Sequence, residues 1–456
     1  MRVDQVGYAL GEAKHAYLLG GAQGTFTVVD DHGRTVRQGR IGPVSARGMT
    51  ATKPFSTSTC PLWTYRVTAA GATSPPFRID TARRLDRKPS HLADCRGTVY
   101  AEPKFAGEGG DEIVEPLTPL GGRVDVEGGW VDAGDFVKFT SNGVLPGRAG
   151  FRAARRPGPS AGEGGTPLSP NLAGRVAAAF ALGAQARTSD VGELVTAFPH
   201  AYYPESSWEG DLELGATQLA LAARELDDPR ATGWARDAAK WAKTYIAGDG
   251  KSTLNLYDTS ALAHADLAGL LRTGVSGAAL GVRELAADPR RQLDTGVERA
   301  GQSPFRTAVD VTDFDAAGKS FGFAATARLY QRVTGDPRYA AFGARQRDFT
   351  LGANAWGVSL VVGVGATFPR CPHHQAANLA GPSKVLYGAV VNGPNGADNF
   401  ADLPFPAGAK ECTRPDESFN GQGSRYADDP SSWPSNEPAI DFTSTALLAF
   451  SLAGTS

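Results

Sequence analysis

The spacing of the apolar residues changes once along this chain of 456 residues, from an alternation typical of strands to a spacing typical of helices. Residues 1 to about 82 contain short alternating runs, and the turn Asp30–Gly33 separates two of them as in a hairpin. Short strands at this spacing predict a small all-β, immunoglobulin-like sandwich. Because no cluster of titratable residues stands out in this part, we interpret it as a packing or spacer module.

From about residue 168 the chain is rich in alanine, with apolar residues at helical spacing and short polar breaks. This pattern predicts an array of antiparallel helical hairpins. The predicted helices span residues 171–188, 211–226, 232–246, 259–271, 313–334, 337–351 and 438–453. Stretches rich in glycine and proline interrupt them near residues 101–130, 141–169 and 354–436. Long loops on a helical scaffold are usually functional, so we searched these three stretches for chemistry.

The charge balance excludes several classes of protein. Lys and Arg number 46 against 48 Asp and Glu, a formal net charge of −2, which argues against a nucleic-acid binder. There is no run of about 18 apolar residues and no polybasic cluster, so we expect no membrane association. No signal peptide is recognisable, which predicts either a cytoplasmic protein or a mature secreted form.

The cysteines are four and scattered: Cys60, Cys95, Cys371 and Cys412. They form no CxxC pair, which makes a zinc ribbon or a thioredoxin-like site unlikely on sequence grounds. Cys371 and Cys412 flank one loop-rich region. The sequence leaves open whether they form a disulfide or stay as two buried thiols.

The first candidate site is the glycine-rich turn of residues 128–138, which carries Asp132 and Asp135 three positions apart, after Trp130. Glycines let a backbone approach a ligand closely, and two carboxylates so placed can hold one water or one cation between them. The alternative is an Asx turn or a helix cap, for which aspartate is common.

The second candidate site combines two later loops. Glu437 precedes Pro438, a residue suited to open a helix, so the glutamate can act as an acid or merely as a partner of the helix dipole. Trp433 offers a flat face for a sugar ring. His373 and His374 are adjacent and therefore lack the helical spacing of metal ligands, so a structural role stays open for them.

Together these segments resemble glycoside hydrolase family 9, the inverting cellulase-type enzymes. The DAGD turn after GGW resembles the family's base motif, and the spacing from Ser359 to His373 resembles its histidine motif. Tyr426, Asp428, Trp433 and Glu437 resemble its acid motif. The opening VDQVGY is similar to the immunoglobulin-like module that precedes many members. The resemblance covers nearly the whole chain.

The resemblance implies two domains, an immunoglobulin-like module over residues 1–82 and an (α/α)6 barrel over residues 83–456. It assigns Asp135 as the general base, Asp132 as a residue that helps to hold the water, and Glu437 as the general acid. In an inverting enzyme the two carboxyl groups stand roughly 6.5–9.5 Å apart.

The resemblance also implies residues that bind substrate. His373 is expected to bind a sugar hydroxyl, and Asp428 is expected to support the site or to contact substrate. Aromatic faces for stacking on pyranose rings would come from Trp130, Trp356 and Trp433, although core packing is the alternative for each of them.

Several positions depart from the family pattern. Gln375 stands where the family usually has an arginine, Thr367 stands where it usually has an asparagine or another polar-basic residue, and Thr443 replaces a common asparagine. Cys95 has no cysteine or histidine partners in residues 96–130, so zinc is not expected. A structural calcium ion is common in the family, and Asp211 and Asp258 are its candidate ligands. The chemistry itself requires no cofactor.

We therefore predict an endo-β-1,4-glucanase that acts as a monomer on β-glucan. Because polymeric glucan lies outside the cell, we expect a secreted protein. Three alternatives stay open: an exo-acting β-glucosidase, a β-glucosaminidase, and a carbohydrate-binding relative without activity.

Overall fold

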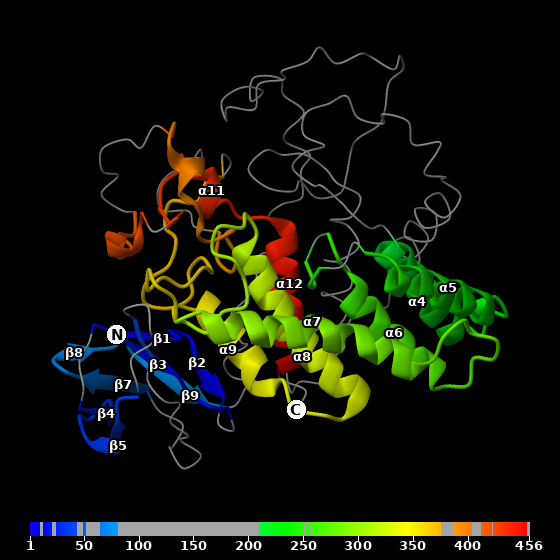
Figure 1. The fold of residues 1–456 in the computed structure, drawn as a ribbon, viewed down its shortest axis with the longest axis horizontal. Helices are drawn as coiled ribbons and strands as arrows, with labels where there is room; N and C mark the ends of the chain where they lie inside the picture. The colour runs from blue at the N-terminus through cyan, green and yellow to red at the C-terminus, as the bar shows by residue number, and fades with distance from the viewer. Residues whose placement is uncertain are drawn as a thin grey trace. The chain divides into compact units, whose positions relative to one another are not determined.

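A computed structural model describes residues 1–9, 12–20, 24–42, 49–51, 64–80, 209–249, 252–255, 257–374, 386–403, 412–421 and 423–453, and the statements below concern these residues. The chain forms two compact units (Figure 1). The first unit comprises Met1–Asp94, Leu293–Gln331 and Asp336–Ser456, and the second comprises Cys95–Gln292 and Arg332–Gly335.

The N-terminal part of the first unit consists of strands. One sheet has the order β1-β3-β6, and the other has the order β2-β9-β7-β4-β5, with β8 paired to β7. The predicted hairpin is confirmed, because β4 and β5 pair antiparallel on either side of the turn at Asp30–Gly33. The bounds are β1 Arg2–Val3, β2 Gly7–Ala9, β3 Ala16–Leu19, β4 Thr25–Asp30, β5 Thr35–Arg40, β6 Met49–Ala51, β7 Thr64–Ala69, β8 Ala72–Thr73 and β9 Phe77–Asp80.

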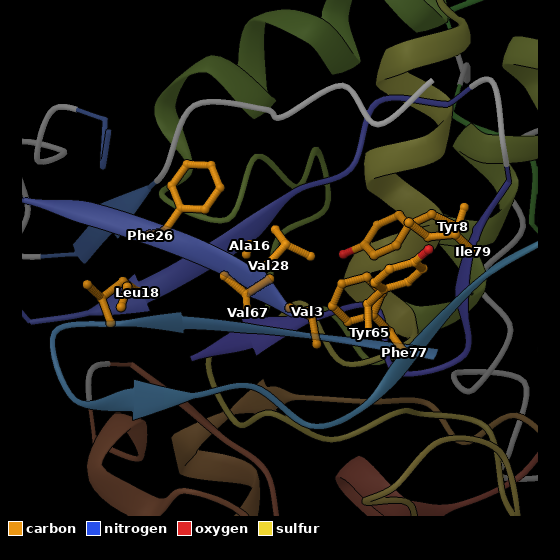
Figure 2. Packing of buried hydrophobic residues seen from close by; sticks show 11 residues of the cluster. Val3, Tyr8, Ala16, Leu18, Phe26, Val28, Tyr65, Val67, Phe77 and Ile79 are labelled. Carbon is orange, nitrogen blue, oxygen red and sulfur yellow. The ribbon is translucent and has the colours of Figure 1, made fainter. Parts of the chain in front are cut away.

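A hydrophobic cluster joins residues of both sheets (Figure 2). Val3 and Leu18 come from the first sheet, while Tyr8, Phe77 and Ile79 come from the second. The ring of Tyr8 meets the ring of Phe77 edge-on at 5.4 Å between centroids, which is a favoured geometry for aromatic pairs. The predicted all-β module is therefore confirmed in the described residues, whereas its predicted boundary near residue 82 lies outside them.

Helices form the rest of the first unit: most of α8 (Ala316–Thr334), α9 (Ala340–Thr350), α12 (Ile440–Ala453) and the end of α7 (Val282–Gln302). Nearly every side chain of α12 is buried, and the hydroxyls of three of its buried serines and threonines bond to backbone carbonyls of the same helix. Phe321 of α8 contacts Phe450 of α12 with ring centroids 5.5 Å apart. These helices belong to the same unit as the described loop residues 351–374, 386–403, 412–421 and 423–438.

The second unit contains α4 (Glu209–Glu225), α5 (Ala231–Ala247) and α6 (Ser260–Leu271), and α4 packs against both of the others. Small buried alanines on α5, such as Ala235 and Ala242, allow this close packing. His264 of α6 and Glu213 of α4 are fully buried, and Nδ1 of the histidine lies 2.7 Å from the glutamate Oε1.

The predicted helices agree with the observed ones to within about three residues, with two exceptions. The helix expected at residues 171–188 lies outside the described residues. The prediction was wrong in omitting α7, because Pro289 lies inside this helix and a proline in a sequence normally indicates a break. Among the helices that the structure describes, none combines the length and the hydropathy needed to cross a bilayer.

Buried charges join the β-module to helices α8 and α9. The guanidinium of Arg347 donates to Glu12 Oε2 at 2.9 Å, and Arg328 lies 3.1 Å from the other oxygen of Glu12. Arg347 also donates to Asp348 at 3.0 Å. Burial favours a raised pKa for Glu12, but the two arginines and the backbone N–H of Ala9 outweigh it and lower this pKa to about 2.

This lowered pKa predicts a pH dependence of stability. A carboxyl group whose folded-state pKa lies below its unfolded value stabilises the fold above the unfolded pKa, and this contribution disappears as pH falls through the folded pKa. We expect Glu12→Gln to lower the free energy of unfolding by roughly 2–3 kcal/mol at pH 7, and the difference from wild type to vanish between pH 4.5 and 2. Urea unfolding at a series of pH values measures this difference.

The matched control is Glu417→Gln, because Glu417 is exposed. We expect no more than about 0.5 kcal/mol from it at any pH. A Glu12→Gln difference that stayed constant down to pH 2 would contradict the ion-pair explanation.

Candidate active site

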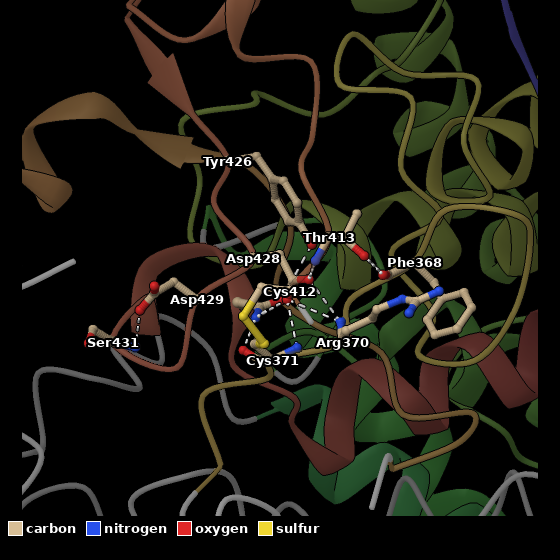
Figure 3. The surroundings of a disulfide bond; sticks show 10 residues. Phe368, Arg370, Cys371, Cys412, Thr413, Tyr426, Asp428, Asp429 and Ser431 are labelled. Carbon is tan, nitrogen blue, oxygen red and sulfur yellow. Dashed lines mark hydrogen bonds between the residues drawn. A yellow bond between two sulfur atoms is a disulfide. The ribbon is translucent and has the colours of Figure 1, made fainter. Parts of the chain in front are cut away.

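A buried carboxylate, Asp428, lies at the centre of the loops of the first unit (Figure 3). Its Oδ1 accepts hydrogen bonds from the backbone N–H of Cys371 at 2.9 Å and from Asn436 Nδ2 at 2.9 Å. Its Oδ2 accepts from the backbone N–H of Arg370 at 2.9 Å and of Thr413 at 2.5 Å. Asp428 is 6% exposed, so these donors take the place of water around the charge.

The donors belong to three different segments, so the carboxylate joins them. A disulfide between Cys371 and Cys412 connects two of these segments next to Asp428 (Figure 3). Of the two states that the sequence left open for these cysteines, the structure contains the bridged one. Thr413 adds a further bond, from its hydroxyl to the carbonyl of Phe368 at 2.5 Å.

Asn436 connects Asp428 to the neighbouring Glu437. The side chain of Asn436 is fully buried: its amide donates to Asp428 and to the Cys371 carbonyl, and its Oδ1 accepts from the hydroxyl of Tyr426. Its backbone carbonyl accepts the backbone N–H of His373 at 2.8 Å. The histidine segment and the acid segment are therefore in direct contact.

The backbone of Glu437 is fixed from the other side by Asn392. The Glu437 N–H donates to Asn392 Oδ1 at 3.1 Å, and the Asn392 N–H donates to the Glu437 carbonyl at 3.0 Å. Asn392 Nδ2 also donates to the carbonyl of Trp433 at 2.7 Å. Glu437 directly follows the short helix α11 (Trp433–Asn436); its backbone is extended and its side chain is half-buried. This arrangement holds the acid segment at two points of its backbone.

Thr443 strengthens the same contact one turn into α12. Its hydroxyl donates to the carbonyl of Ala439 at 2.9 Å and accepts the backbone N–H of Val390 at 3.1 Å. Thr443 stands where an asparagine is common in the family pattern, and its two hydrogen bonds give it a structural role in this chain. It attaches the segment that contains Asn392 to the start of α12.

The two histidines differ in their surroundings. His373 Nδ1 lies 2.6 Å from the carbonyl of Pro430, which requires the proton on Nδ1 and leaves Nε2 as the acceptor of a neutral ring. His374 is 7% exposed, and burial, followed by the electrostatic effect of the adjacent His373 ring, lowers its pKa to about 4. His374 is therefore neutral at ordinary pH, and the ring of His373 is oriented by its bond to Pro430.

Two of the three predicted aromatic platforms lie in the described residues. The Trp433 ring is half-buried and lies 6.1 Å from the ring of Phe314, which is 37% exposed. Trp356 is 4% exposed and donates its indole N–H to Asn420 at 2.8 Å, an environment that favours packing over stacking on a sugar. Trp130, Asp132 and Asp135 lie outside the described residues, so their roles stay predictions.

The candidate calcium ligands lie in the second unit. Asp258 uses both oxygens for protein donors: Tyr245 donates at 2.6 Å and Ser260 at 3.0 Å. Asp211 accepts from the hydroxyl of Thr259 at 3.1 Å. In the part of the chain that the structure describes, no three acidic, histidine or cysteine side chains converge as metal ligands. These residues do not form a calcium cage by themselves, and the assignment of Asp211 and Asp258 stays a prediction.

The sequence indicated Asp428, His373 and Glu437 but not the two asparagines that hold them. Asn436 directly precedes the candidate acid, and this position is the only sign of its role. Asn392 carries no local signal, because its partners are more than 40 residues away along the chain.

Curated relatives match short parts of the chain. The xyloglucan-specific endo-beta-1,4-glucanase of Bacteroides ovatus is 31% identical over 165 residues, which is 35% of this chain and 26% of that protein. Endoglucanase B of Cellulomonas fimi is 42% identical over 78 residues, which is 15% of this chain and 7% of that protein. The chain thus matches about a quarter or less of the length of these two relatives.

Solved structures match over nearly the full length. An endoglucanase of Alicyclobacillus acidocaldarius superimposes with a TM-score of 0.65 at 17% identity, covering 100% of this chain and 99% of that one. A Bacteroides ovatus family 9 protein gives a TM-score of 0.61 at 19% identity, covering 99% and 98%. These similarities confirm the predicted fold class, a small all-β module followed by an α/α barrel.

A sequence model of one family covers more than half of the chain. The model, described as glycosyl hydrolase family 9, matches residues 166–450. The matched range contains His373, Asp428 and Glu437, and it begins after Asp132 and Asp135. With the resemblance of the motifs and the shared fold, this match shows that the chain belongs to glycosyl hydrolase family 9.

Proposed function

We propose that this chain is a secreted endo-β-1,4-glucanase that acts as a monomer and inverts the configuration of the anomeric carbon. One observation carries the proposal: the backbone contact of His373 with Asn436 places the histidine segment against the acid segment around Asp428. The names of the curated relatives, which include several endoglucanases, support β-1,4-glucan as the substrate.

In the proposed reaction Asp135 takes a proton from a water molecule, which Asp132 helps to hold. The water oxygen attacks the anomeric carbon while the bond to the leaving oxygen breaks, and protonated Glu437 gives its proton to that oxygen. Each turnover leaves Asp135 protonated and Glu437 ionised, so a proton returns to Glu437 through solvent. A half-buried position lets Glu437 reach both the substrate and water.

The backbone of Glu437 is held at two points by Asn392, which fixes the position of the proposed acid. His373, with its Nδ1 proton donated to Pro430, presents Nε2 as an acceptor for a sugar hydroxyl. Trp433 and the exposed Phe314 supply the aromatic surface next to the acid.

The disulfide supports the proposed location. Structural disulfides persist in oxidising compartments and are rare in the cytoplasm. A chain that acts on polymeric glucan meets its substrate in such a compartment.

The first experiment is digestion of end-labelled cellohexaose by the wild-type chain. We expect products of several intermediate lengths, because an endo-acting enzyme cuts internal bonds. Proton NMR during the first turnovers should detect the α-anomer at the new reducing end, as inversion requires. Glucose as the sole early product would instead favour exo action, and no cleavage would favour an amino-sugar substrate or a binding-only role.

The assigned acid and base are tested by Glu437→Gln and Asp135→Asn. We expect each variant to lower kcat on cellohexaose by at least about a hundredfold with an unchanged melting temperature, because proton transfer is lost while the shape is kept. The exposed Asp398→Asn is the matched control and should keep the wild-type rate. Wild-type turnover by either variant would remove its assigned role.

Asp428 is tested by Asp428→Asn. In the variant, the NH2 group of the asparagine would face backbone N–H groups that bond to a carboxylate oxygen in the wild type. We therefore expect the variant to lose about 1–3 kcal/mol of stability and at least tenfold in kcat. Urea unfolding and steady-state kinetics measure the two effects. The neighbouring Asp429→Asn keeps its oxygen for the Ser431 N–H and should behave as wild type.

A further inference from the structure

The opening motif VDQVGY forms a tight turn between β1 and β2. Asp4 Oδ1 accepts the backbone N–H groups of Val6 at 2.8 Å and Gly7 at 2.9 Å. Gly7 has a φ of +133°, and a Cβ there would lie 2.4 Å from the carbonyl oxygen of Arg78, so only glycine fits. The Tyr8 hydroxyl accepts the Asp4 N–H at 3.0 Å. These contacts fix the conformation on both sides of Gln5.

Gln5 uses this fixed turn to bind the loop of residues 351–367. Its Nε2 donates to the carbonyl of Gly357 at 2.8 Å, and its Oε1 accepts the N–H groups of Ala366 at 2.9 Å and Thr367 at 2.8 Å. Its backbone N–H donates to the carbonyl of Leu351 at 2.9 Å. The backbone of Gln5 thus bonds to the start of the loop, and its side chain, 7% exposed, bonds to the middle and the end.

The loop leaves room for this one side chain. A Cβ at Gly352 would lie 2.7 Å from Gln5 Nε2, and a Cβ at Gly365 would lie 3.2 Å from Gln5 Oε1. The loop closes on itself where the Ser359 N–H donates to the Thr367 carbonyl at 2.8 Å. The amide of Gln5 therefore occupies a site that two glycines keep open.

The bound end of this loop leads directly into the candidate active site. Phe368 follows Thr367 and accepts the hydroxyl of Thr413, and the N–H groups of Arg370 and Cys371 reach Asp428. His373 comes two residues later. From Ala366 to His373 the backbone is therefore held by a series of hydrogen bonds that begins at Gln5.

We propose that Gln5 is a positioning residue for hydrolysis, through which the β-module sets the place of His373 and of the acid segment. The inference rests on the proposed function and extends it to a residue of the β-module, outside the base, histidine and acid motifs. A carboxamide donates and accepts at once without charge, which suits a buried site with one carbonyl and two N–H partners. A protonated glutamate has the same shape and the same capacity, whereas an ionised glutamate loses the donor to Gly357.

The test compares Gln5→Glu and Gln5→Ala with wild type on cellohexaose between pH 4 and 8. We expect Gln5→Ala to lower kcat at least about tenfold, with a smaller change in KM, because small displacements of reacting groups cost large factors in rate. We expect the kcat of Gln5→Glu, relative to wild type, to rise as pH falls and the buried carboxyl takes up a proton. The exposed Gln38→Glu on β5 is the matched control and should show no such pH dependence.

Hydrogen exchange of peptides covering residues 357–374 provides the readout that does not depend on activity. Faster exchange there in Gln5→Ala, with the β-module unchanged, supports the proposal. A kcat within twofold of wild type, or unchanged exchange, overturns it. If Gln5→Ala does not fold, the decisive quantity is the kcat of Gln5→Glu divided by that of wild type. A ratio that stays constant from pH 4 to 8 overturns the proposal. A wild-type chain inert towards glucans refutes the proposed function, and the exchange data then decide the role of Gln5 alone.

Discussion

A single buried carboxylate organises the candidate active site. Asp428 carries its charge inside the protein, and its donors are neutral backbone and amide N–H groups from three segments. An unpaired buried charge is costly, so the segments are stable around it only when all of them are in place. The disulfide adds a covalent link at the same point. The histidine and acid segments therefore form one cooperative unit and not two independent loops.

The backbone segments that carry Glu437 and His373 are held by the amide side chains of three residues. Asn436 and Asn392 bind the backbone on either side of Glu437, and Gln5 binds the loop that precedes His373. Amides fix a backbone by paired donors and acceptors and add no net charge. Charged pairs also join the β-module to the rest of the first unit, where Arg347 meets Glu12 and Arg2 meets Asp416.

Elements with a local signature were predictable from the sequence. Alternation indicated β4 and β5, and helical spacing indicated α4, α8 and α12. Helix α7 was not predicted because Pro289 indicates a helix break in the sequence. Leu285 and Leu293 are nevertheless buried on either side of Pro289, so tertiary packing overrides the cost of a proline inside a helix. The motifs indicated Asp428, His373 and Glu437, whereas Gln5 and Asn392 bind partners distant in sequence, which no local pattern encodes.

The bond between Gln5 and Ala366 spans 361 positions of sequence. During synthesis at about 5–20 residues per second, the first strands emerge roughly 20–70 s before the loop that Gln5 binds. The β-module can fold around its own hydrophobic cluster in that interval. The amide of Gln5 stays exposed to water until the loop that it binds has been made. Closure of the loop on the module is then a late step of folding, and a nascent chain acquires its ordered histidine segment only after Asn436 has been made.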